Sequence, residues 1–141
     1  YSPDIISYGM PANWCAAAMV YALVEGLVGV KDNGTLYNKV VFAPRWTASE
    51  VKKVDATIRY GSSEGYVSYK YEINASSINI VYTGNSSETE CRILLPEGKK
   101  ATAVAINGAS VPFTTERVEQ SNYAVCTMKG KSVNRINCTF Q

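Results

Sequence analysis

The chain has 141 residues, with 14 Lys and Arg against 12 Asp and Glu, and it contains no histidine. This length fits one domain with at most a fragment of a second, and a net charge of only +2 with scattered basic residues does not favour a nucleic-acid partner. The lack of histidine removes the commonest general base, the commonest metal ligand and every His-dependent catalytic triad.

An apolar segment near the start of the chain predicts a helix over residues 12–29. The segment is rich in good helix formers and is closed by Gly29 and a following Asp-Asn-Gly turn. From Trp14 to Val30 only Glu25 carries a charge, so the apolar surface would surround the helix instead of forming one stripe. Such a helix needs cover on all sides, from protein or from lipid.

Protein is favoured over lipid as that cover. The segment only just reaches the lower limit for a membrane span, and it contains Glu25, three consecutive alanines and no flanking Lys or Arg cluster. We therefore expect a helical domain whose other helices are absent from this chain, with an arginine of that domain as the partner of Glu25. The chain also starts at Tyr1 without an initiator methionine or a charged leader. We expect it to be a piece of a larger protein.

Beyond residue 36 the apolar residues recur with period two, which indicates strands. Apolar and polar residues alternate along residues 54–60 and 67–73, with a turn at residues 61–65 between them. A second turn leads into the apolar positions of residues 78–82. These three strands are predicted to form a meander.

Further strands complete a predicted antiparallel β-sandwich. Asn107-Gly108, the strongest short hairpin signal, joins two short strands, and Gly130 joins the last two segments, residues 118–128 and 132–140. The total is about eight or nine strands when residues 37–42 and 91–95 are included. The fold class is therefore mainly β, with one apolar α-helix before the sandwich and a loop over residues 30–36.

The four cysteines do not have the spacing of a metal or redox site. Cys15, Cys91, Cys126 and Cys138 form no C-x-x-C motif, and no other metal ligands accompany them. Buried free thiols are favoured. The alternative is a disulfide between Cys126 and Cys138, although a hairpin turning near Gly130 would not place these two residues directly opposite each other. No metal and no cofactor are predicted.

No catalytic residue can be assigned in this chain. Most carboxylates fall on the polar faces of strands or in turns, and phosphate-binding loops and nucleophile elbows are absent. Trp46 is the best candidate for an aromatic ring that stacks on a sugar. The favoured interpretation of Trp46 and Arg45 is packing at the junction between domains, because they follow the helix-to-sheet loop.

The order of these features resembles a known family. The helix Ala12-Asn-Trp-Cys…Val30, the segment Val41-Phe-Ala-Pro-Arg-Trp46, the Tyr-rich strands and the turn Leu94-Leu-Pro-Glu-Gly98 are similar to the C-terminal end of the six-hairpin, (α/α)6-barrel glycoside hydrolases of gut bacteria. In such enzymes a β-sandwich follows the last barrel helix and packs on the barrel, which holds the catalytic carboxylates.

The resemblance implies a division of the chain and a role for it. Residues 1–30 would be the last barrel helix with the loop that leads into it, and residues 36–141 the β-sandwich. Because such loops can line the substrate cleft, Asp4, Tyr8 and Asn13 join Trp46 as candidate substrate contacts.

The expected function is that of a non-catalytic accessory domain. It would support a catalytic barrel of the same protein, a glycoside hydrolase of the periplasm or the extracellular space. Its partners would be that barrel and an oligo- or polysaccharide, without a membrane. Two alternatives remain, a carbohydrate-binding module and an immunoglobulin-like interaction domain.

Overall fold

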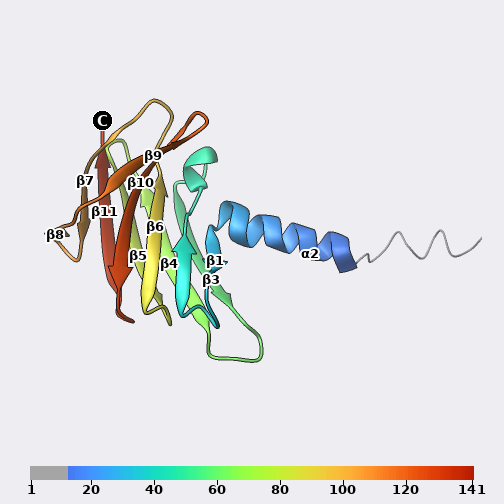
Figure 1. Cartoon of the computed structure of the whole chain (residues 1–141). Helices are drawn as coiled ribbons and strands as arrows, with labels where there is room; N and C mark the ends of the chain where they lie inside the picture. Colours follow the sequence, from blue (N-terminus) through green and yellow to red (C-terminus); the bar gives the residue numbers. More distant parts are fainter. Residues whose placement is uncertain (1–12) are drawn as a thin grey trace, which may run out of the picture.

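Two facing β-sheets form the body of the molecule in a computed structural model that describes residues 13–141, with the backbone alone at Asn13 (Figure 1). The strands arise from the period-two segments, because a strand points successive side chains to opposite faces. The eleven strands are β1 (Val30–Asp32), β2 (Lys39–Phe42), β3 (Lys53–Arg59), β4 (Tyr66–Ile73), β5 (Ser77–Gly84), β6 (Glu88–Leu94), β7 (Ala101–Ile106), β8 (Ala109–Ser110), β9 (Thr114–Val118), β10 (Ser121–Lys129) and β11 (Asn134–Phe140).

The strand order is β1-β2-β6-β10-β9 in the first sheet and β3-β4-β5-β11-β7-β8 in the second. Within the described residues, neighbouring strands pair antiparallel, except that β2 and β6 run parallel with Phe42 opposite Cys91. The meander of β3, β4 and β5 lies between these two strands in the sequence and belongs to the other sheet. The predicted mainly-β sandwich and its three-stranded meander are confirmed.

Aromatic side chains fill the centre of the sandwich. The Phe42 ring lies 4.8 Å from the ring of Tyr69 and 5.0 Å from that of Tyr82, measured between centroids. Buried Tyr82 satisfies its hydroxyl with Ser86 at 2.8 Å and Thr89 at 3.2 Å. The core is therefore apolar in its rings, and the polar tip of Tyr82 has partners.

The strand number exceeds the expected eight or nine for local reasons. Residues 30–32, expected to be loop, form β1 and pair with β2. The strand expected over residues 118–128 begins only at Ser121, after a turn at Glu119, where φ is 54°. Residues 114–118 before this turn form the additional strand β9, which pairs with β10. The Asn107-Gly108 hairpin is confirmed, with φ of 53° and 83° at its two central residues, as a type I′ turn requires.

The last two strands do not pair with each other. Strand β10 lies between β6 and β9, whereas β11 lies between β5 and β7 in the opposite sheet. Cys126 and Cys138 are therefore in different sheets, and both are free and buried, as is Cys91. Cys15 is also free but exposed, so the expectation of a buried thiol is wrong at this position, because nothing in the described chain covers its helix.

One helix precedes the sheets and extends away from them (Figure 1). It begins as α2 (Asn13–Tyr21) and continues as the wider π-helical turn η1 (Ala22–Leu27), in which Val28 N donates to Leu23 O at 2.9 Å. The short 3-10 turn η2 (Trp46–Ala48) follows β2. The segment between β2 and η2 returns to the end of the helix, and this contact positions the candidate site.

Candidate functional site

The helix exposes the apolar residues that predicted it. Every residue from 14 to 23 is exposed, and residues 24–27 are half-buried. The exposed fraction is 74% for Trp14 and Met19, 61% for Tyr21 and 52% for Leu23. A contiguous apolar surface of this kind marks an interaction site on a folded protein. Residues 13–141 contain no helix with the length and apolarity that a membrane span needs.

Arg45 holds the C-terminal end of this helix. The last carbonyl groups of a helix have no partner within it, and they carry the negative end of its dipole. The guanidinium of Arg45 donates from Nη1 to the carbonyl oxygen of Glu25 at 2.8 Å and to that of Gly26. The backbone N–H of Arg45 donates to the carbonyl oxygen of Leu27 at 3.0 Å. One residue of the sandwich thus satisfies three successive helix carbonyls.

Tyr69 and Trp46 extend this contact into the core. The Tyr69 hydroxyl donates to the carbonyl oxygen of Val28 at 2.8 Å and accepts from Trp46 Nε1 at 2.8 Å. Burial raises the pKa of Tyr69 to about 12, so the hydroxyl keeps its proton at neutral pH. The structure places the half-buried Trp46 at the junction, with its indole N–H already bonded. Its contact with a sugar stays a prediction.

Gly29 fixes the direction in which the helix leaves the sandwich. Its φ is 72°, in the left-handed region that a glycine adopts without strain. A Cβ at this position would lie 2.0 Å from the carbonyl oxygen of Ala43. The backbone N–H of Ala43 also donates to the carbonyl oxygen of Gly29 at 2.6 Å. Only glycine allows the two backbones to come this close. We name Arg45, Tyr69, Trp46 and Gly29 the anchor.

An open hollow of about 730 Å³ lies in the angle between the helix and η2. The end of α2, η1, η2 and one anchor residue line it. The lining residues are Tyr21, Ala22, Glu25, Gly26, Leu27, Arg45 and Ala48. Glu25 raises the pKa of the exposed Tyr21 through hydrogen bonding and through its negative charge. The hollow and the helix therefore form one continuous, mostly apolar surface.

The structure does not describe the side chains of the other candidate residues from the sequence. Asp4 and Tyr8 lie outside the described residues, as does the side chain of Asn13. Tyr69 was not singled out from the sequence, because its alternating position indicates only that it is buried. Residues 13–141 hold no cluster of three His, Cys, Asp or Glu side chains that could bind a metal ion.

Comparisons with known proteins give a likeness to a solved structure. No family model matches the chain. No curated protein matches it either. Among solved structures, the α-L-rhamnosidase from Dictyoglumus thermophilum is similar over 80% of this chain, with a TM-score of 0.57 and 17% sequence identity. The chain spans only 12% of the length of that enzyme. At this identity the likeness shows a shared fold of the sandwich.

Proposed function

We propose that this chain is a non-catalytic accessory domain of a glycoside hydrolase, and that its helix packs into a helical barrel of the same protein. The exposed apolar surface of the helix carries the proposal, because such a surface is stable in water only when another body covers it. The similarity of the fold to a small part of a glycoside hydrolase supports the choice of parent enzyme.

The anchor supports a fixed geometry for this contact. A helix held only by a flexible linker would lose conformational entropy on docking, whereas this one is already oriented by Arg45, Tyr69 and Gly29. The hollow beside η2 can accept side chains that protrude from the partner surface. The helix and the sandwich would then both contact the barrel, with the anchor located between the helix and the sandwich.

A non-catalytic role agrees with the state of the carboxylates. Four of them already pair with basic side chains, namely Asp55, Glu72, Glu90 and Glu116. Asp32 accepts hydrogen bonds from the N–H groups of Gly34 and Tyr37 and from the hydroxyl of Tyr60. Glycoside hydrolysis usually needs two carboxylates facing one bond, with one of them kept protonated. The contacts of these five carboxylates are made within strands and turns and do not form that arrangement.

The first test measures hydrolysis by the purified chain. We expect no turnover of a panel of aryl glycosides, including an aryl α-L-rhamnoside, above the rate of a buffer blank. Turnover that copurifies with the chain through two independent columns would overturn the non-catalytic role.

The second test measures heat stability of the parent enzyme after Leu23→Glu. Burying a charge in the barrel contact should lower its melting temperature by several degrees, whereas the isolated chain should be unaffected. Val118→Glu is the matched control, because Val118 is 51% exposed and Leu23 is 52% exposed. Equal effects of the two variants on the parent enzyme would contradict the docking of the helix.

A further inference from the structure

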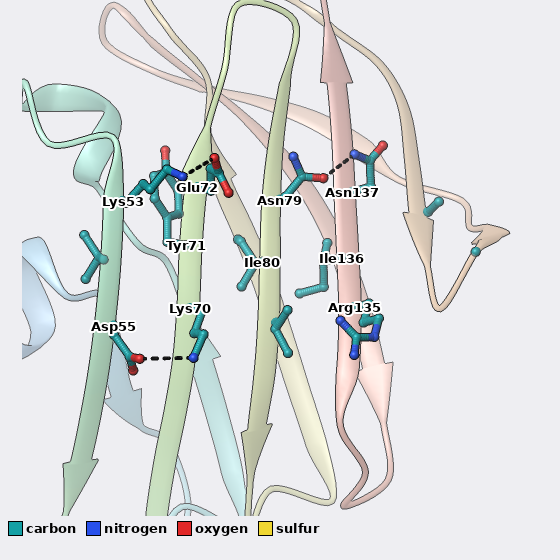
Figure 2. A pocket seen from close by; sticks show the side chains of 14 residues that line it. Lys53, Asp55, Lys70, Tyr71, Glu72, Asn79, Ile80, Arg135, Ile136 and Asn137 are labelled. Atoms are coloured by element: carbon teal, nitrogen blue, oxygen red, sulfur yellow. Dashed lines mark hydrogen bonds and ion pairs between the residues drawn. The ribbon is translucent and has the colours of Figure 1, made fainter.

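The outer face of the second sheet carries a hollow of about 700 Å³, away from the helix and its anchor (Figure 2). Strands β3, β4, β5 and β11 supply most of its walls, and β7 with the turn after it supplies one side. The lining residues that point outward from the sheet are mainly polar or charged. Two are apolar: Val81 on β5, whose register partners are Lys70 and Arg135, and Ala105 on β7, whose register partner is Asn137. The hollow thus combines apolar contacts with convergent polar groups, which is typical of ligand sites.

Most polar side chains of this hollow have a partner on the neighbouring strand. Figure 2 shows the pairs, which are Lys53 with Glu72 at 2.9 Å, Lys70 with Asp55 at 3.5 Å, and Asn137 Nδ2 donating to Asn79 Oδ1 at 2.7 Å. These ion pairs are exposed and therefore contribute little to stability. They can exchange partners with a ligand at little cost.

Arg135 differs from the other charged residues of the hollow. Its register partner on β5 is the apolar Val81, and no carboxylate among the described residues pairs with its guanidinium. Its backbone N–H is already bonded to Asn107 Oδ1 at 2.8 Å, which fixes the strand there. Three basic and two acidic side chains line the hollow, which leaves a net charge of 3 − 2 = +1. The excess charge is located at Arg135.

We propose that this hollow binds a carboxylate-bearing saccharide, such as an oligosaccharide of uronic acids. The planar guanidinium of Arg135 can donate two parallel hydrogen bonds to a carboxylate. Val81, the register partner of Arg135, offers an apolar contact to the C–H face of a sugar ring. Asn137 lies two residues along β11 from Arg135, a spacing of about 6.8 Å that fits one ring. Its Oδ1 can accept from a sugar hydroxyl.

The sheet itself favours a saccharide over an acidic peptide as the ligand. A bound peptide commonly adds a strand to a free sheet edge and uses main-chain hydrogen bonds. The edge strand β3 borders one side of the hollow, but the part with Arg135 lies over β5 and β11, each of which is paired on both sides. A ligand there meets side chains only, and a saccharide needs no main-chain partner. The site does not depend on the docking of the helix.

Titration calorimetry of the purified chain with a tetramer of α-1,4-linked galacturonate tests the assignment. Binding should weaken as salt rises, and Arg135→Gln should weaken it by at least about tenfold. Arg135→Lys keeps the charge but loses the planar guanidinium. Its affinity for the tetramer should lie between that of the unchanged chain and that of Arg135→Gln. Arg59→Gln is the matched control, because Arg59 belongs to β3 of the same sheet but does not line the hollow.

Four outcomes would overturn the proposal. These are an absence of heat with the galacturonate tetramer, unchanged affinity in Arg135→Gln, equal affinity for the neutral galactose tetramer, and equal affinity for a tetraglutamate peptide. Thermal unfolding of each variant accompanies the titrations. Since Arg135 is exposed, its replacement should leave the melting temperature within about two degrees.

Discussion

Apolar side chains have opposite environments in the two regions of this molecule. Phe42 and Ile78 in the sandwich have 0% of their surface exposed, whereas Trp14 and Met19 on the helix have 74% exposed. The first pair stabilises the chain itself by leaving water, but the second pair contributes almost nothing within the described residues. The contrast separates residues that hold the fold from residues available for contact with another body.

The anchor lies between these two regions and belongs to both. It uses buried backbone carbonyl groups of the helix end and polar groups of the sandwich, so it can be broken without removing an apolar core residue. Variants in the core, in the anchor and on the helix should therefore have effects on stability that differ in magnitude and in kind. The expected effects decrease in that order.

Truncation in the core should have the largest effect. Phe42→Ala removes a ring that contacts Tyr69 and Tyr82, and we expect the free energy of unfolding to fall by about 3–5 kcal/mol. Met19→Ala is the matched change on the helix and should alter it by no more than about 0.5 kcal/mol. Urea unfolding followed by tyrosine fluorescence measures both. Similar losses in the two variants would show that the helix is buried in solution.

Gly29→Ala tests the close approach of the helix to the sandwich. The new Cβ would meet the carbonyl of Ala43, and we expect a loss of about 2–4 kcal/mol because neither backbone can move away. Gly98→Ala is the control, since Gly98 has the same φ of 72° with nothing within 4 Å of the added Cβ. That control should cost only about 1–2 kcal/mol for its left-handed backbone. An equal cost at both positions would exclude the steric role.

Tyr69→Phe and Tyr71→Phe each remove one buried hydroxyl. The Tyr69 hydroxyl bonds to Val28 and Trp46, so its loss leaves the buried Val28 carbonyl and the half-buried Trp46 N–H unpaired and should cost about 1–3 kcal/mol. The Tyr71 hydroxyl has no hydrogen-bond partner among the described residues, and its removal should be neutral or slightly stabilising. Urea unfolding measures the free energy of unfolding of both variants. A larger loss of this free energy in Tyr71→Phe than in Tyr69→Phe would contradict the role of Tyr69 in the anchor.

Alkaline pH should weaken the sandwich partly through Tyr69. Its pKa is raised to about 12 by burial, above the usual value near 10 of the unfolded chain. Between these two pH values the unfolded state loses the proton and the folded state keeps it, so stability falls as pH rises from about 10 to 12. At pH 11 the loss is about 1 kcal/mol. Unfolding curves at pH 9 and 11 measure it, and Tyr69→Phe should show a smaller pH difference.

Local patterns predicted the elements, but not all the pairings between them. The helix and the meander follow from residues close in sequence, as does the hairpin at Asn107-Gly108. Short connections also suggested that the last two strands pair, yet β11 fills the position between β5 and β7 and leaves β10 to the other sheet. Such competition between sheets depends on contacts distant in the sequence, which periodicity does not encode.

The anchor could be predicted only in part for the same reason. The position of Arg45 and Trp46 after the helix-to-sheet loop indicated a junction, and the structure places both residues there. The hydrogen bond from Tyr69 to Val28 joins residues 41 positions apart. Nothing in the alternation along β4 distinguishes this tyrosine from Tyr71, since only the tertiary structure brings the Val28 carbonyl to one hydroxyl and not to the other.

Among the anchor variants, Arg45→Gln should give the smallest change in global stability. It removes the guanidinium from the carbonyl oxygens of Glu25 and Gly26 and should cost about 0.3–1 kcal/mol, as expected for a cation at a helix C-terminus. Hydrogen exchange should nevertheless accelerate severalfold at the amides of α2 and η1, while the amides of β5 and β11 keep their protection. Arg117→Gln is the control, because Arg117 makes a similar bond to the Glu119 carbonyl oxygen at 2.8 Å in an exposed turn. Faster exchange throughout the sandwich would mean that Arg45 holds the fold as a whole. Faster exchange confined to the helix would mean that it orients a surface for binding.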